Sequence, residues 1–142
     1  MIYKAIQGLP QAHARIKGSK EYPDIRGNVY LYEVYNGTVL LGELMGIPEE
    51  LEKKYGGFFG FHIHEGNVCT GDSQDPFADT KGHYNPEKEE HPRHAGDLPP
   101  VLSNDGTAWM EIYTGRFYPM DVVGRTIVLH EMPDDFKTQP SG

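Results

Sequence analysis

The sequence predicts an all-β fold, a β-sandwich or flattened barrel, and three observations support this prediction. The chain contains 17 glycines and 11 prolines among 142 residues, which indicates many turns. Short runs rich in valine, tyrosine and leucine are separated by glycine, proline and asparagine, as is typical of strands. The segments between these runs have the lengths of Greek-key connections. The length is that of one ordinary domain, so residues 1–142 are expected to form a single domain.

The first half of the chain is expected to form four strands after a short lead-in over residues 1–11. Asn36-Gly37 predicts a two-residue hairpin turn between the second and third strands. Residues 47–54 predict one or two helical turns, because Pro48 suits a first turn and the acidic residues after it suit a helix N-terminus. The expected strands are residues 12–17, 27–35, 38–45 and 58–64.

The second half begins with a long segment without periodicity, residues 65–99. A structureless stretch of this length is unusual in a compact domain unless it is functional or tied down. It holds four candidate metal ligands, so metal binding would order it. Beyond it, Asn104-Asp105-Gly106 predicts another hairpin turn, residues 115–121 a connection and residues 131–142 a polar tail. The expected strands are residues 100–103, 107–113 and 125–130.

The charge and composition of the chain limit its partners. The formal net charge is −8 and the pI about 5.3, whereas nucleic acids and anionic membranes attract basic surfaces, so neither partner is expected. No apolar run approaches transmembrane length, and the first ten residues lack the apolar core of a secretory signal. Cys69 is the single cysteine, so no internal disulfide is expected, which favours a cytoplasmic location.

Six of the seven histidines form an ordered series of short motifs. Imidazole is the commonest metal ligand in proteins and suits copper and zinc. Six imidazoles and one carboxylate, Asp97, are too many ligands for one tetrahedral ion, so the series suggests two neighbouring metals. The six are His62, His64, His83, His91, His94 and His130.

The first candidate site lies on the strand expected over residues 58–64. Residues two apart share one face of a strand, so His62 and His64 project together while Phe61 and Ile63 point into the core. His130, at the end of another strand, is expected to complete the site from across the sandwich. A set of imidazoles alone suits copper.

The second candidate site lies in the long segment. Its three nitrogens and one oxygen make a closed tetrahedral set that suits structural zinc. His83 is expected to bridge the two ions if both of its ring nitrogens bind metal. Asp134 or Asp135 is expected to hold ligand imidazoles from outside the sites. The zinc set is His83, His91, His94 and Asp97.

Each cluster taken alone can be explained without a metal. Histidines two apart on a strand can simply lie on the protein surface, and the residues from His91 to Asp97 can form a solvated turn. Four clusters in one domain favour metal binding. His13 is interpreted as an ordinary strand residue.

These residues resemble the copper–zinc superoxide dismutase family over about Ala12 to Gly142. The residues 138–142 also resemble the stretch before the family's last strand. The motifs that carry the resemblance are Gly60-Phe61-His62-Ile63-His64-Glu65, Gly82-His83-Tyr84-Asn85-Pro86, His94-x-Gly96-Asp97-Leu98-Pro99 and Gly124-Arg125-Thr126-Ile127-Val128-Leu129-His130-Glu131.

The resemblance implies a Greek-key flattened β-barrel and an antioxidant oxidoreductase that converts superoxide anion and protons into oxygen and hydrogen peroxide. His62, His64, His83 and His130 would bind copper, and His83, His91, His94 and Asp97 would bind zinc. His83 would act catalytically, leaving reduced copper, taking up a proton and returning it. Asp134 would link a copper ligand to a zinc ligand, and zinc would hold the loop and tune the basicity of His83.

The sequence departs from the family pattern in three places. It stops at Gly142, before the family's strand with an arginine above the copper and the partner of its disulfide, which leaves Cys69 unpaired. The spacing from His91 to His94 is also short for the family. A truncated form with reduced efficiency is therefore expected, and residues 1–11 or a second chain are expected to fill the vacated slot.

Residues of the metal loop are candidates to attract the superoxide anion. Local positive charge against the net charge of −8 comes from Lys81, Lys88 and Arg93. Arg93 is the candidate residue that guides the anion. The alternative is that Arg93 is an ordinary solvated arginine of the loop.

Three functions stay open from the sequence. The first is a superoxide dismutase, the second a copper- or zinc-binding protein with little or no such activity, and the third a structural sandwich with zinc at both sites. A homodimer is also open, because tyrosine is enriched at interfaces. Nucleophilic catalysis is not expected, because the sequence has no Gly-x-Ser-x-Gly elbow.

Overall fold

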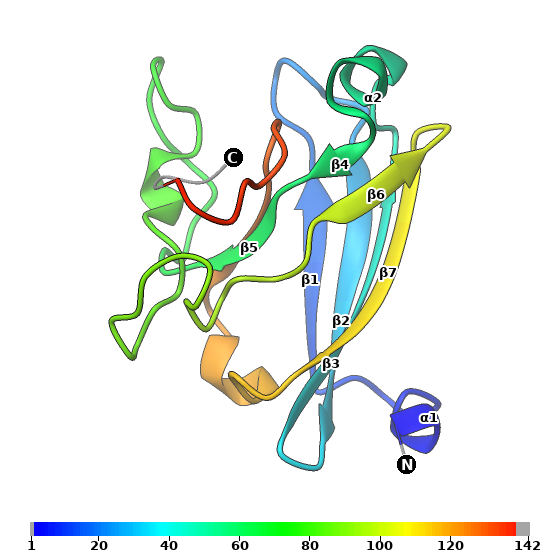
Figure 1. Cartoon of the computed structure of the whole chain (residues 1–142), viewed down its shortest axis with the longest axis vertical. Helices are drawn as coiled ribbons and strands as arrows, with labels where there is room; N and C mark the ends of the chain where they lie inside the picture. The colour runs from blue at the N-terminus through cyan, green and yellow to red at the C-terminus, as the bar shows by residue number, and fades with distance from the viewer. Residues whose placement is uncertain (1, 139–142) are drawn as a thin grey trace.

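The structure, a computed structural model, describes residues 2–138 and has the predicted all-β, Greek-key architecture of a flattened, open barrel (Figure 1). One sheet has the strand order β1-β2-β3-β7-β6-β4 and a second pairs β5 with β8, all antiparallel. Strand β7 lies beside β3 although three strands intervene in sequence, which is the Greek-key crossover. The strands are β1 (Ala12–Lys17), β2 (Arg26–Val34), β3 (Gly37–Met45), β4 (Phe58–Phe59), β5 (Phe61–His64), β6 (Val101–Asn104), β7 (Thr107–Thr114) and β8 (Thr126–Leu129).

Four short helices complete the elements found between residues 2 and 138. Helix α2 is the helix expected near Pro48, and its C-terminus is capped by Gly56 at φ 72°. The helices are α1 (Ile2–Ala5), α2 (Glu49–Tyr55) and the 3₁₀ helices η1 (Ala78–Thr80) and η2 (Pro119–Val122). Within residues 2–138, no helix has the length and apolar character needed to cross a membrane.

The predicted strand over residues 58–64 passes from one sheet to the other at Gly60. Gly60 donates its N–H to the Met132 carbonyl (2.9 Å) and accepts the His130 N–H (2.8 Å). A Cβ at this position would lie 3.2 Å from the His62 ring and 3.4 Å from the His130 Cβ, so glycine permits the close approach. The bend divides the strand into β4 and β5 and brings His130 beside β5.

The hairpin between β2 and β3 differs from the prediction by one residue. Val34 pairs with Gly37, so the turn is Tyr35-Asn36 and Asn36 has the positive φ of 65°. Gly37 serves packing instead, because a Cβ there would lie 2.2 Å from the Thr114 carbonyl oxygen. The second hairpin has Asp105-Gly106 as its two turn residues, both with positive φ.

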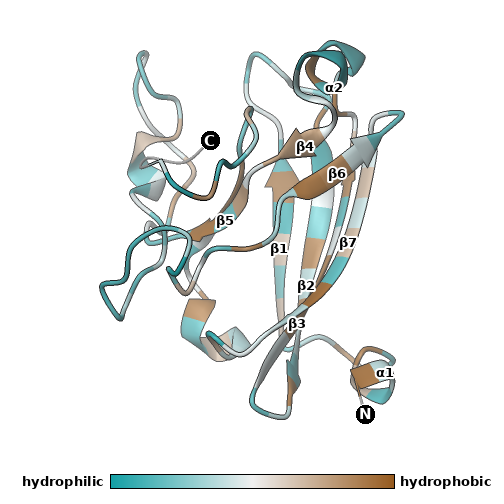
Figure 2. Cartoon of the chain, viewed as in Figure 1, coloured by the Kyte–Doolittle hydropathy of each residue, from teal (hydrophilic) through white to brown (hydrophobic). Residues whose placement is uncertain are grey.

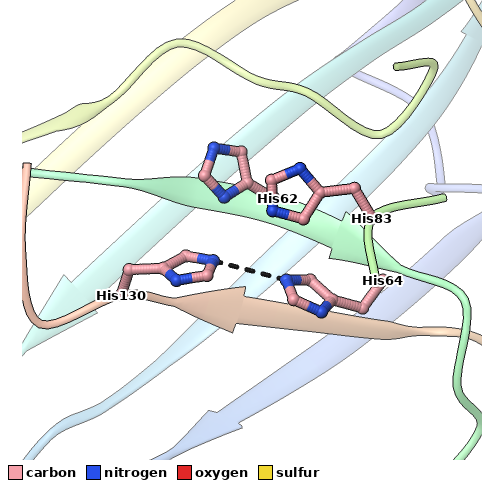
Figure 3. A group of neighbouring side chains, drawn as sticks. All are labelled: His62, His64, His83 and His130. Atoms are coloured by element: carbon pink, nitrogen blue, oxygen red, sulfur yellow. Dashed lines mark hydrogen bonds between the residues drawn. The ribbon is translucent and has the colours of Figure 1, made fainter. Parts of the chain in front are cut away.

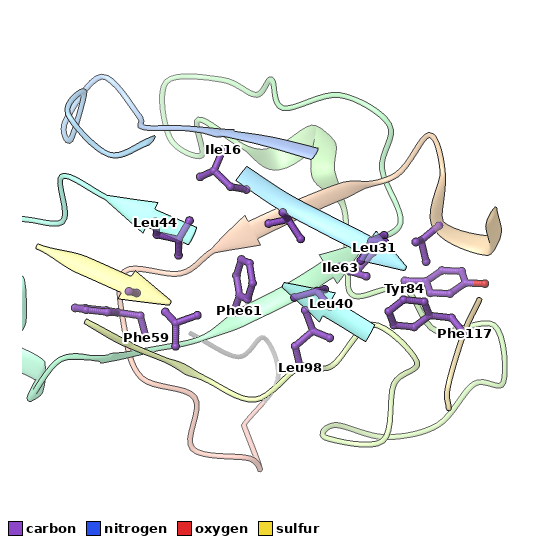
Figure 4. Close-up of a cluster of buried hydrophobic side chains, with 14 of the residues drawn as sticks. Ile16, Leu31, Leu40, Leu44, Phe59, Phe61, Ile63, Tyr84, Leu98 and Phe117 are labelled. Atoms are coloured by element: carbon purple, nitrogen blue, oxygen red, sulfur yellow. The ribbon is translucent and has the colours of Figure 1, made fainter. Parts of the chain in front are cut away.

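The core fills the space between the two sheets. Figure 4 shows Phe61 and Ile63 of β5 facing Leu40 and the other apolar side chains of the larger sheet, and hydropathy alternates along β1 and β2 in Figure 2. Phe61 is 0% and Ile63 1% exposed. Burial of these side chains on a strand contributes about 1.5–3 kcal/mol each and fixes the opposite face of β5 in place.

Residues 2–11 form no strand of either sheet, so the first of the two alternatives for the vacated slot, that the lead-in fills it, is wrong. Residues 2–5 form α1 at the lower end of the view in Figure 1, and Ala5 and Ile6 pack against the cluster of Tyr32, Val34 and Val39. This second apolar cluster lies on the outer face of β2 and β3. The lead-in covers these side chains, which would otherwise be exposed to solvent. Whether a second chain lies beside β1 stays a prediction.

Candidate metal centre

The candidate ligands of the first cluster come from β5, the end of β8 and the loop between β5 and β6. Strand β5 pairs with β8 so that Phe61 lies opposite Leu129, and His130 follows directly. His83 reaches the same place because Tyr84 donates its N–H to the Ile63 carbonyl at 2.8 Å. Figure 3 shows the four imidazoles side by side. The expectation that His130 lies across the sandwich is wrong, because it comes from the neighbouring strand.

The four imidazoles of the first cluster face one another closely. One ring nitrogen of each lies within 4.8 Å of one from every other. The His64 and His130 Nε2 atoms are 3.3 Å apart, and the His62 and His83 rings stack with centroids at 4.1 Å. The cluster is His62, His64, His83 and His130.

Hydrogen bonds fix which nitrogen of two imidazoles carries the proton. His64 donates from Nδ1 to the Lys81 carbonyl at 2.7 Å, so its Nε2 keeps a lone pair. His62 donates from Nε2 to Asp134 at 2.7 Å, and its buried Nδ1 has no hydrogen-bond partner among the described residues. An unpaired buried nitrogen costs about 1–3 kcal/mol, so a cation there would be stabilising. This cluster therefore fits a metal ion.

Burial keeps these imidazoles neutral. It lowers the pKa of His62 to about 4, with the nearby His83 acting in the same direction and Asp134 opposing it. Burial likewise lowers the pKa of His64 to about 4, against the hydrogen bond to Lys81. Neutral imidazole is the form that binds metal, so both rings are ready ligands at neutral pH.

The second cluster gathers the four predicted loop residues. His83 Nδ1 lies 2.7 Å from Asp97 Oδ1 and 3.2 Å from His94 Nδ1. His91 Nδ1 lies 3.1 Å from Asp97 Oδ2. Burial alone would raise the pKa of Asp97, but the hydrogen bond with His83 and the other imidazoles outweigh it and lower the pKa. The cluster is His83, His91, His94 and Asp97.

The donor set of the second cluster also fits a cation. His91 donates from Nε2 to Asp134 at 2.7 Å, so in the neutral ring Nδ1 carries a lone pair that faces the Asp97 carboxylate. A lone pair opposite an oxygen acceptor is unfavourable unless a proton or a metal ion lies between them.

Asp134 joins the two clusters, and the structure distinguishes it from Asp135. Its Oδ2 accepts from His62 and its Oδ1 from His91, both at 2.7 Å, and the residue is buried. Asp135 instead accepts the backbone N–H groups of residues 137 and 138 in an exposed turn. One carboxylate thus orients one imidazole of each cluster.

Comparison with known proteins agrees with this geometry. The family model for copper/zinc superoxide dismutase (SODC) matches residues 25–142. The chain belongs to the copper/zinc superoxide dismutase family. It is 29% identical over 147 residues to Superoxide dismutase [Cu-Zn] 2 of Aquifex aeolicus (strain VF5), covering 93% of this chain and 80% of that protein. It is 29% identical over 122 residues to the Extracellular superoxide dismutase [Cu-Zn] of Brugia pahangi, covering 79% of this chain and 56% of that protein.

Family membership confirms the resemblance and the fold predicted from the sequence, and it implies copper and zinc as the metals. All seven residues that the sequence predicts as metal ligands lie in the two clusters. The basic residues proposed as guides, Lys81, Lys88 and Arg93, are exposed.

Sequence reasoning missed the residues that hold the ligand loop of this family member. Arg125 donates to the Glu65 carbonyl (3.1 Å) and carboxylate (2.8 Å), and its guanidinium lies 4.3 Å from the Tyr84 ring centroid. Glu65 in turn accepts the Asn85 N–H at 3.0 Å. In the sequence, these two residues are marked only by their positions, because Glu65 directly follows the candidate ligand His64 and Arg125 directly precedes β8.

Proposed function

We propose that this protein is a superoxide dismutase that converts two superoxide anions and two protons into oxygen and hydrogen peroxide. The observation that carries the proposal is a pair of buried ligand clusters that share His83 and are linked by Asp134. The all-imidazole cluster suits copper, and the cluster of three nitrogens and one oxygen suits zinc. His62, His64, His83 and His130 would hold copper, and His83, His91, His94 and Asp97 would hold zinc.

The shared residue, His83, has a nitrogen for each ion. Its Nδ1 lies among the zinc-type ligands, at 2.7 Å from Asp97 and 3.2 Å from His94, which leaves Nε2 for the other cluster. Loss of both ring protons is feasible between two cations. Because the zinc-type contacts fix the ring through Nδ1, proton uptake and release would occur at Nε2.

Copper held by His62, His64, His83 and His130 would supply the one-electron redox chemistry that oxidises one superoxide and reduces the next. His83 then takes up a proton at Nε2 and delivers it to the reduced substrate, which leaves as peroxide after a second proton arrives from solvent. His62 and His64 hold their tautomers through Asp134 and the Lys81 carbonyl during this cycle.

The approach of the substrate depends on local charge. The net charge of −8 repels an anion, and electrostatic steering changes association rates by about 10 to 10³-fold. Lys81 is exposed, and its carbonyl contacts the His64 ring, so its ammonium is a source of positive charge near the copper-type cluster.

The decisive experiment measures the decay of superoxide per bound copper in protein loaded with both metals. A chelator that inactivates free copper is present throughout. We expect rapid decay under these conditions, its loss in His130→Ala, and an unchanged rate in His13→Ala. His13 is the matched control because it bonds to Asn28 on the outer side of β1 and belongs to neither cluster. A wild-type rate no higher than that of the chelated copper alone would refute the proposal.

That negative result would favour the second candidate, a copper- and zinc-binding protein with little dismutase activity. The unfavourable net charge for an anionic substrate is the observation on its side.

A further inference from the structure

The part of the loop that carries His91 and His94 contains no helix or strand from residue 85 to residue 100 of the described chain. Its Asp97 end is attached to the barrel, because Ile63 of β5 donates its N–H to the Gly96 carbonyl at 2.9 Å. Local hydrogen bonds such as Arg93 N–H to the Glu90 carbonyl shape the other end without attaching it to a strand. Asp134 and Asp97 hold the His91 ring, and Asp97 accepts the His94 N–H at 2.9 Å, but none of these bonds ties the backbone of residues 91–94 to the larger sheet.

Arg116, which follows β7, makes that attachment. Its Nη1 donates to the Pro92 carbonyl at 2.8 Å and to the His94 carbonyl at 3.0 Å. The first carbonyl belongs to the residue directly after His91, and the second to a candidate ligand itself. One nitrogen thus fixes the peptide groups next to both imidazoles.

The base of the Arg116 side chain is itself held by the barrel. Its backbone N–H donates to Thr114 Oγ1 at 3.1 Å. The next residue, Phe117, is 3% exposed in the core, and its carbonyl accepts the Thr38 hydroxyl at 2.8 Å. The guanidinium therefore connects the ligand loop to the larger sheet and fixes the loop relative to it.

Arg93 provides the contrast within the loop. Both arginines are exposed, and Arg93 lies between His91 and His94 in sequence, yet within residues 2–138 its side chain pairs with Glu89, at 3.4 Å, and with no loop carbonyl. Proximity in sequence to the ligands does not give it a role in placing them.

We infer that Arg116 is a positioning residue for the zinc-type cluster, holding His91 and His94 at the separation that a tetrahedral ion requires. The inference rests on the proposed function, because it assumes that this cluster binds zinc. Groups that orient metal ligands typically change metal affinity by about 10–100-fold when they are removed. Arg116 acts through two backbone carbonyls, so we expect its removal to weaken zinc binding about tenfold.

The test uses the full chain and three variants, Arg116→Ala, Arg116→Lys and the control Arg93→Ala. Zinc affinity is measured by competition with a chelator, copper affinity is measured in parallel, and the visible spectrum of Co²⁺ bound in place of zinc reports the ligand geometry. We expect Arg116→Ala to lose about tenfold in zinc affinity, with a smaller change for copper and an altered cobalt spectrum. Arg116→Lys, which keeps a charged donor, should recover part of the loss, and Arg93→Ala should match the wild type.

Zinc affinity and a cobalt spectrum unchanged in Arg116→Ala would overturn the inference. An equal loss of zinc and copper affinity would also overturn it, because that pattern indicates general destabilisation. If Arg116→Ala does not fold, Arg116→Met, which keeps the apolar stem and removes the donors, is judged by the same criteria. A wild-type cluster that takes up no zinc would overturn this inference. Failure of the proposed function is seen separately, in the superoxide decay per bound copper of the wild-type protein.

Discussion

Lys81 has a backbone conformation that favours glycine, and replacing it should therefore separate stability from activity. It has φ 62° and ψ −157°, a region essentially restricted to glycine. Its N–H donates to the Ala78 carbonyl at 3.1 Å and its carbonyl accepts from His64, so the backbone alone makes both bonds. Lys81→Gly keeps these contacts and removes the steric conflict of the Cβ.

The expected stability change follows from two opposing terms. Relief of the strained conformation contributes about 1–3 kcal/mol. The added freedom of glycine in the unfolded chain costs about 0.5–1 kcal/mol. We therefore expect metal-free Lys81→Gly to be more stable than the wild type by about 1 kcal/mol, or about 3 °C in Tm for a chain of this length.

The same variant should react more slowly with superoxide. A unit charge at about 10 Å in water is worth about 0.4 kcal/mol, a factor of about two in rate. The loss should be visible at low ionic strength and vanish in high salt, since salt screens exposed charges.

Lys81→Ala is the matched control, because alanine removes the charge but keeps the Cβ. It should share the slower rate without the gain in stability. Denaturant unfolding of the metal-free proteins and superoxide decay per copper test both parts. If Lys81→Gly is no more stable than Lys81→Ala, the strain argument is wrong, and if both keep the wild-type rate at low salt, the charge argument is wrong.

Three further predictions concern the buried parts of the site. Asp134→Asn turns one carboxylate acceptor into a donor that faces an imidazole N–H. The affinity for both metals, measured by chelator competition, should therefore fall about 10–100-fold. Unchanged affinities would contradict the role of Asp134 in orienting His62 and His91. The pKa values of His62 and His64 are lowered from 6.5 to about 4 in the folded protein. Between pH 4 and pH 6.5 the folded protein therefore binds fewer protons than the unfolded protein. The metal-free protein should therefore lose stability as the pH falls from about 6.5 to about 4, by up to about 3 kcal/mol per group, whereas a flat profile in urea unfolding would refute the assignment. Gly96→Ala places a Cβ 2.3 Å from a β5 carbonyl oxygen and should destabilise the fold by about 1–3 kcal/mol, whereas Gly82→Ala, with open space around it, should be close to neutral in the same assay.

The sequence predicted those features of the fold and site that depend on local pattern. The residue types between successive turn residues predicted β1 over residues 12–17, its observed bounds, and the period of two placed His62 and His64 on one face of β5. The ligand residues were predictable because six histidines and an aspartate have few other reasons to cluster in four short motifs.

Features set by distant contacts could not be predicted in the same way. Gly37 resembled a turn residue, but contact with the Thr114 carbonyl explains why it is glycine. The strand order places His130 beside β5, and no local pattern encodes that order. The attachment made by Arg116 consists of hydrogen bonds to two backbone carbonyls, which any residue at the receiving position provides, so the sequence contains no signal for it.

If the two clusters hold copper and zinc as proposed, the position of Asp134 between them would make the uptake of the two ions cooperative. One carboxylate orients His62 and His91, so an ion that immobilises either imidazole also restricts the other through the shared oxygen pair. Thermodynamic linkage makes this effect reciprocal, and the factor by which zinc raises the affinity for copper equals the factor by which copper raises the affinity for zinc. An affinity of this protein for either metal is therefore defined only together with the occupancy of the neighbouring site.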